Sequence, residues 1–117
     1  MLLASRDPKR LGDWYVEALG PDKVNEVDQY RILQFGSFTV LIDERSDVAD
    51  TNPDPTRVIL NFHVDDAAAV ARRLDGMGVE WIAELEERDG SFFATAKDPD
   101  GNYVQVIQLS AEARAAM

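Results

Sequence analysis

One pattern of helix-bounding residues occurs twice in this chain of 117 residues, and it constrains the fold more than any single residue does. Asp7 and Gly20 bound one helical pattern, and Asp65 and Gly78 bound a second. Aspartate favours the N-cap of a helix, and glycine accepts the left-handed conformation that ends one. An apolar run precedes each aspartate. Both copies are therefore predicted to begin as a strand that leads into a helix.

Strand patterns follow each helical pattern, because apolar residues there alternate or cluster between turn residues. The predicted strands are Val24–Val27, Tyr30–Phe35 and Phe38–Glu44 in the first copy, and Val79–Leu85, Ser91–Lys97 and Tyr103–Leu109 in the second. The last two strands are separated by DPDGN, whose proline, glycine and short polar side chains predict a hairpin turn. Each copy is thus predicted to be βαβββ, and the fold class to be α+β.

The two copies are expected to form a single domain. We expect units at residues 1–45 and 58–109, a linker at 46–57 and a short tail at 110–117. The linker is polar, contains two prolines and has no periodicity, as is typical of a connecting loop. A chain of this length buries roughly two-thirds of its unfolded surface, which suits one domain.

Composition and charge exclude several classes of function. Acidic residues number 22 against 12 basic ones, giving a net charge of −10. Nucleic-acid binding depends on cationic side chains, so nucleic acid is not expected as a partner, whereas cationic small molecules are attracted. The absence of cysteine excludes disulfides and thiolate metal sites. No apolar run reaches membrane length and the N-terminus does not resemble a signal peptide, so we expect a cytoplasmic protein without a membrane partner.

Three segments carry a resemblance to a known superfamily. RDPKRLGDWYVEALG near the start, FHVDD before the second helix and AKDPDGNYVQVIQL near the end resemble the vicinal oxygen chelate superfamily, which includes glyoxalase I, extradiol dioxygenases and bleomycin resistance proteins. With the repeated βαβββ order, the resemblance covers nearly the whole chain. It implies curved sheets around a cavity, with two units of one chain or of two chains completing a site. It also implies a homodimer.

The resemblance further implies four metal-ligand positions, as found in the enzymes of this superfamily. One falls on Gln105, where glutamate is usual. The others fall on Ile59, near Ile42, and at Met1 or just before it. A neutral amide and aliphatic side chains do not hold a hard or borderline cation. We therefore expect no metal and no other cofactor, and no residue is assigned a catalytic role.

Strand alternation predicts which side chains line a pocket. Ile59, Asn61 and His63 share one face of their strand, and Tyr103, Gln105 and Ile107 share one face of another. The predicted ligand-binding residues are Val40, Ile42, Ile59, Asn61, His63, Tyr103 and Gln105. An apolar wall with a few hydrogen-bonding groups is typical of an organic-ligand pocket, although the same side chains also suit a packed interior. The carboxylate pair Asp43–Glu44 is expected to be solvated.

Two functions remain open. The first is a metal-free binding protein, similar to the bleomycin resistance branch, that sequesters an aromatic or cationic organic ligand and so confers antibiotic resistance. The second is a glyoxalase- or dioxygenase-like enzyme with an atypical active site. Its metal ligands then lie at positions other than those assigned above, or groups such as His63 and Tyr103 act as general acid and base. The missing metal ligands favour the first.

Overall fold

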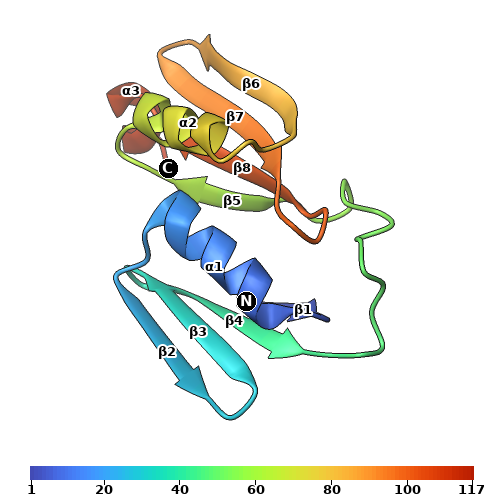
Figure 1. Ribbon diagram of the computed structural model, residues 1–117. Coiled ribbons are helices and arrows are strands. Elements are labelled where there is room, and N and C mark those ends of the chain that lie inside the picture. The colour runs from blue at the N-terminus through green and yellow to red at the C-terminus, as the bar shows by residue number, and fades with distance from the viewer. The chain divides into compact units, whose positions relative to one another are not determined.

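The computed structural model describes residues 1–117 and consists of two compact units, Met1–Pro53 and Asp54–Met117 (Figure 1). We call them unit 1 and unit 2. Each contains one four-stranded sheet with a helix packed on it. The α+β class and the repeated βαβββ order predicted from the sequence are therefore confirmed. None of the helices combines the length and the apolar character needed to cross a membrane.

Unit 1 joins its first strand to its last by a parallel pairing. Its elements are β1 (Leu2–Ser5), α1 (Pro8–Leu19), β2 (Lys23–Val27), β3 (Tyr30–Phe35) and β4 (Phe38–Glu44). The strand order is β1-β4-β3-β2, with β1 parallel to β4 and the other pairs antiparallel. Parallel strands need a crossover connection, and α1 is the first element of the connection between β1 and β4. The hairpin between β3 and β4 turns at Gly36, whose φ is 59°.

Helix α1 begins and ends at the residues that the sequence indicated. The side chain of Asp7 accepts a hydrogen bond from the backbone N–H of Arg10, and Gly20 ends the helix in the left-handed conformation. Its inner face is fully buried and carries Leu11, Tyr15 and Ala18. These residues form the core of unit 1 with the facing side of the sheet.

Arg31 of β3 lies against α1 at a position where the helix has no side chain. Its Nη1 donates to the backbone oxygen of Lys9 at 3.1 Å and to Oδ1 of Asp13 at 2.6 Å. A Cβ at Gly12 would lie 2.7 Å from Cδ of Arg31, so glycine permits this close approach. Hydrogen bonds from Lys9 and Arg31 lower the pKa of Asp13 below its ordinary value. Arg31 thus identifies the sheet face that packs on α1.

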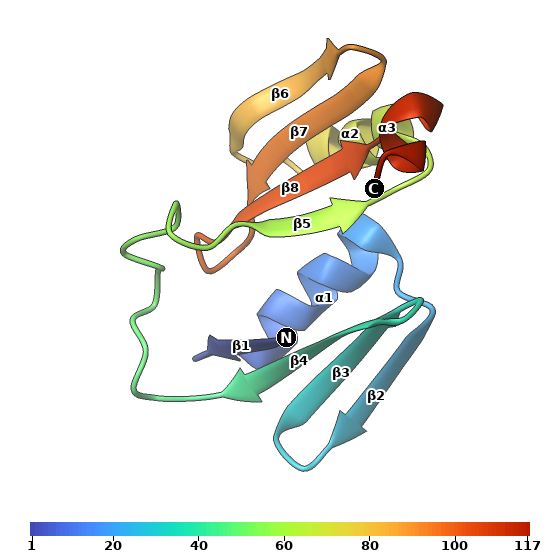
Figure 2. The ribbon, with the colours of Figure 1, turned by 180° about the vertical axis from the view of Figure 1, so that it is seen from behind.

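Unit 2 has the same order of strands and one additional helix. Its elements are β5 (Leu60–His63), α2 (Ala67–Gly76), β6 (Trp81–Arg88), β7 (Ser91–Lys97), β8 (Tyr103–Gln108) and α3 (Ala111–Ala115), as Figure 2 also shows. The strand order is β5-β8-β7-β6, with β5 parallel to β8. Asp66, the residue after the Asp65 noted in the sequence, caps α2, and its side chain accepts a hydrogen bond from the backbone N–H of Ala69.

Two elements of unit 2 differ from the sequence-based prediction. Strand β6 begins at Trp81 and ends at Arg88, whereas the prediction was Val79–Leu85. Its pairing with β7 shifts register between Trp81 and Glu86. These shifts interrupt the alternation on which the prediction depended. Helix α3 forms in the predicted tail, where Ser110 accepts a hydrogen bond from the backbone N–H of Ala113. The cap stabilises the first turn of this short helix. The segment has no apolar periodicity, so the sequence did not predict it.

The turn between β7 and β8 is held by a buried aspartate. Asp98 is 4% exposed, and its carboxylate accepts hydrogen bonds from the backbone N–H groups of Asp100 and Asn102 and from Nδ2 of Asn102. Gly101 adopts a positive φ of 80°. The predicted hairpin turn is confirmed, and it fixes the register in which β8 presents its side chains.

Candidate functional site

One face of the unit 2 sheet packs on α2 and the other does not. Even-numbered residues of β8 lie on the α2 side, because Oε1 of Gln108 accepts a hydrogen bond from the first residue of α2, Ala67, at 2.8 Å. Val104 and Val106 share that side and are almost fully buried. By alternation, the odd-numbered residues of β8 point to the opposite face.

The opposite face gathers most of the predicted site residues. Asn61 pairs with Gln105 and His63 pairs with Ile107 across β5 and β8, and Thr95 of β7 pairs with Gln105 from the other side. We call this the Gln105 face, and its members on β5, β7 and β8 are Asn61, His63, Phe93, Thr95, Lys97, Tyr103, Gln105 and Ile107. Ile59 directly precedes β5 and is 40% exposed. Sequence reasoning missed Phe93 and Thr95, although both lie in a strand that it did predict.

The Gln105 face combines apolar surface with neutral hydrogen-bonding groups and one cation, Lys97, which forms an ion pair with Glu80 at 3.0 Å. Asn61 and His63 are exposed, Gln105 and Tyr103 are partly exposed, and Thr95 is buried. Amide, imidazole and phenol groups donate and accept hydrogen bonds, and the aromatic ring offers a surface for stacking. Such a face suits the orientation of an organic molecule.

The structure places Val40 and Ile42 elsewhere than the sequence-based prediction did. Both are fully buried, and Ile42 pairs across strands with Arg31, the residue that lies against α1. They belong to the core beneath α1, not to the open face of the unit 1 sheet. The prediction was one residue out of register, and such a slip moves every side chain of a strand to the other face.

Leu41 is the unit 1 counterpart of Gln105. It pairs with Leu2 of β1, as Gln105 pairs with Asn61 of β5, and Leu2 and Asn61 precede their helix caps by the same number of residues. The open face of unit 1 therefore contains Leu41 and, one alternation further, Asp43. We call it the Asp43 face, and its members on β1, β3 and β4 are Leu2, Ala4, Tyr30, Ile32, Gln34, Thr39, Leu41 and Asp43.

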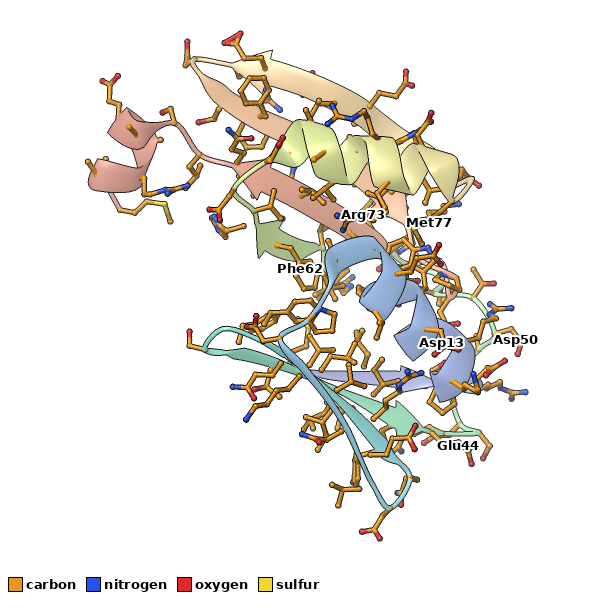
Figure 3. All side chains as sticks on the ribbon, turned by 60° about the vertical axis from the view of Figure 1, so that its left-hand side comes forward. Asp13, Glu44, Asp50, Phe62, Arg73 and Met77 are labelled. Atoms are coloured by element: carbon orange, nitrogen blue, oxygen red, sulfur yellow. The ribbon has the colours of Figure 1, made fainter.

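Asp43 is buried, contrary to the expectation that the Asp43–Glu44 pair is solvated. It is 5% exposed, whereas Glu44 is exposed at the end of β4 (Figure 3). Oδ1 of Asp43 is buried and has no hydrogen-bond partner. The polar pair in the sequence gave no indication that one of its members is enclosed. Asp43 is the functional candidate that sequence reasoning missed.

The donor set does not fit the metal that the superfamily resemblance implies. Of the four ligand positions, Gln105 supplies a neutral amide, and Ile59 and Leu41 supply hydrocarbon. The protein has no group of three or more histidine, aspartate or glutamate side chains placed to hold a metal ion. Divalent cations need several imidazole or carboxylate ligands. The residues at these positions are therefore unsuited to hold a divalent metal ion.

A shallow hollow of about 440 Å³ lies between α2 and the edge strand β6. Small side chains of α2 and the ring of Trp81 line it, and charged side chains of both signs surround it. Nε1 of Trp81 donates to Oδ1 of Asp75 at 3.2 Å, which anchors the ring to the helix. The hollow is open and its charged groups are exposed, so its features are those of an ordinary helix–strand seam.

The geometry agrees with comparisons to solved structures. The fosfomycin resistance protein FosX from Mesorhizobium loti is similar over 98% of this chain and 93% of its own, with 16% identity and a TM-score of 0.74. Lactoylglutathione lyase from Agrobacterium tumefaciens is similar over 92% and 90%, with 22% identity and a TM-score of 0.68. A glyoxalase/bleomycin resistance protein/dioxygenase from Nocardioides is similar over 95% and 82%, with 13% identity and a TM-score of 0.71.

At these identities the structural matches show the fold alone. A comparison with curated proteins gave no match. The model of the glyoxalase-like domain family, however, matches residues 1–107, which is most of the chain. The chain therefore belongs to the glyoxalase-like domain family, within the vicinal oxygen chelate superfamily.

Proposed function

We propose that this protein binds and sequesters a small aromatic or cationic organic molecule without a metal, in the manner of the bleomycin resistance branch of its superfamily. The observation that carries the proposal is the Gln105 face, where a neutral amide stands at the family's carboxylate position among hydrogen-bonding and apolar side chains. Stoichiometric binding needs such groups and no Lewis acid. The similar protein from Nocardioides is described as a glyoxalase/bleomycin resistance protein/dioxygenase, a description that includes this class of function beside two enzymes.

Each group on the Gln105 face has a distinct part in the proposed binding. Gln105 and Asn61 pair across strands, so their amides would hydrogen-bond neighbouring atoms of one ligand. Tyr103 would stack on a planar ring, and Ile59 would contribute an apolar wall. The ring of Phe93 already has the guanidinium of Arg88 over it, 4.9 Å from its centroid. His63 would add a further hydrogen bond at the end of the face.

The proposal also includes a homodimer. The superfamily resemblance favours a site completed by two units, and most closed oligomers of identical chains are two-fold dimers. The acidic charge of −10 would draw cationic ligands toward such a dimer.

A thermal-shift screen of planar aromatic and cationic natural products, followed by calorimetry on the compounds that stabilise the protein, tests the proposed binding. Gln105→Ala is expected to weaken the best ligand by about 0.5–1.5 kcal/mol, the net value of one neutral hydrogen bond, with little change in stability. Gln108→Ala is the matched control, because Gln108 lies on the same strand but faces α2. The control should leave affinity unchanged and lower stability.

Two results would contradict the proposed function. One is that no compound binds, or that binding survives replacement of His63, Tyr103 and Gln105 by alanine together. The other is near-unit occupancy of zinc, nickel, iron or manganese in the purified protein, lost on His63→Ala. That result would favour the glyoxalase- or dioxygenase-like enzyme. We expect instead no stoichiometric metal and no change of melting temperature with chelator.

A further inference from the structure

A planar cation lies on the Gln105 face next to the hairpin between β6 and β7. Phe93 is a member of this face, and Glu86 of β6 pairs with it across strands. Arg88, two residues after Glu86, places its guanidinium over the Phe93 ring, 4.9 Å from the ring centroid. A single hairpin within unit 2 therefore brings the guanidinium onto the face that carries Gln105.

Two contacts hold the guanidinium of Arg88 in this place. The face of the Phe93 ring attracts its positive charge, and its Nη2 donates a hydrogen bond to Oε1 of Glu86 at 2.8 Å. The guanidinium is planar and rigid, so these two contacts fix its orientation as well as its position. A group that is already oriented loses less conformational entropy when a ligand binds to it.

The outer side of the guanidinium is open to solvent. The side chain of Arg88 is 65% exposed, although Phe93 covers it from one side and Glu86 approaches its edge. Guanidinium groups stack on aromatic faces. Because only one side of the group is covered, the other side is available to a ring that comes from outside the protein.

The separation between Arg88 and Gln105 suits one small planar molecule. Phe93 pairs with Ile107, and Thr95 pairs with Gln105, so Phe93 lies one strand and two residues away from Gln105. Neighbouring strands lie about 4.8 Å apart and two residues rise about 6.8 Å, which gives a separation of roughly 8 Å. A fused tricyclic ring system covers this distance, so one molecule can contact both the guanidinium and the Gln105 amide.

We infer that Arg88 is a stacking platform for the planar ring of the ligand, and that this ring carries no positive charge. The inference rests on the proposed function, because it describes the ligand of the same Gln105 face more closely. A guanidinium attracts the electron-rich face of an uncharged ring and repels a cationic one. Of the two kinds of ligand proposed, it selects the uncharged aromatic one.

The test titrates the protein with acridine, which is uncharged in neutral buffer, and with proflavine, a cationic ring system of the same shape, and follows the fluorescence of each. Arg88→Ala is expected to weaken acridine binding about two- to fivefold, the range of an exposed cation–π contact, and to strengthen proflavine binding because the repelling charge is gone. Arg88→Lys is the matched control, since it keeps the charge and loses the planar group. It should also weaken acridine binding but leave proflavine binding unchanged.

Every result supports the inference or overturns it. Unchanged acridine binding in Arg88→Ala overturns it, and so does tighter binding, which would mean that Arg88 shields Phe93 from the ligand. Full retention of acridine binding in Arg88→Lys overturns it as well, because charge alone would then be sufficient. Equal weakening of both probes in Arg88→Ala would indicate general damage to the face and has the same consequence.

Gln105→Ala separates the inference from the proposed function. If Gln105→Ala weakens acridine binding and Arg88→Ala does not, the inference fails and the proposed function stands. If neither variant weakens it, both fail for this probe. A native protein that binds neither acridine nor proflavine overturns the inference, and the wider compound screen then tests the proposed function by itself.

Discussion

Replacing Ile42 by alanine is expected to destabilise unit 1 by about 3–4 kcal/mol. Ile42 is fully buried and sits between Leu3 of β1 and Arg31 of β3 on the face that packs against α1. The change removes three carbon atoms, which amounts to roughly 2.4 kcal/mol of lost transfer free energy at about 0.8 kcal/mol for each. The cavity left beneath α1 adds the remainder, since a packed core relaxes only partly.

Urea unfolding followed by circular dichroism and by the fluorescence of Trp14, which lies on α1, measures this loss. Leu41→Ala is the matched control, because it also removes three carbon atoms. Leu41 directly precedes Ile42, is partly exposed and lies on the opposite face of β4. It should cost less than half as much. If Leu41→Ala cost as much as Ile42→Ala or more, the assignment of the two faces of β4 would be refuted.

Three further predictions concern unit 1 and the assembly. Gly12→Ala is expected to lower the free energy of unfolding in urea, although alanine favours a helix over glycine by about 1 kcal/mol, because the new Cβ would lie 2.7 Å from Cδ of Arg31. In the Arg31→Ala background, which lacks this contact, Gly12→Ala should instead raise it. A single variant more stable than the native protein would contradict the close approach. The pKa of Asp13 is lowered in the folded state, so its contribution to stability is fully present above the ordinary value of 3.8 and is lost as pH falls through the folded value. Asp13→Asn should accordingly flatten the loss of stability below about pH 4, and an unchanged acid profile would argue against the ion pairs with Lys9 and Arg31. Light scattering is expected to give twice the chain mass of 13.1 kDa, and a mass of one chain at about 100 µM would contradict the dimer.

The parts of the fold that follow from local chemistry could be predicted from the sequence. The cap at Asp7, the left-handed end at Gly20 and the turn held by Asp98 each depend on residues within a few positions of one another. In strand β8, alternation places Tyr103, Gln105 and Ile107 on one face and the buried Val104 and Val106 on the other, as the sequence predicted. Periodicity and capping are sufficient evidence in such segments.

The faces of β4 could not be assigned in the same way. Val40, Leu41 and Ile42 are all apolar, so the run does not show which alternate set is buried. The deciding contact is the packing of Arg31 on α1 at Gly12, which joins residues far apart in the chain. Burial of Asp43 likewise depends on tertiary packing rather than on its neighbours in sequence.

The pairing of β1 with β4 bears on how the chain folds as it leaves the ribosome. Every strand that pairs within the first sheet lies before residue 45, so all its partners are present before the last strands of the chain are synthesised. The ribosome adds about 5–20 residues per second, and an N-terminal portion that contains its own contacts folds while the rest of the chain is synthesised. Unit 1 can therefore close its sheet and bury α1 while unit 2 is still being translated. The unit that carries Asp43 would then be the first to fold. Mutations in its core would reduce the yield of protein in the cell before they reduce the affinity for a ligand.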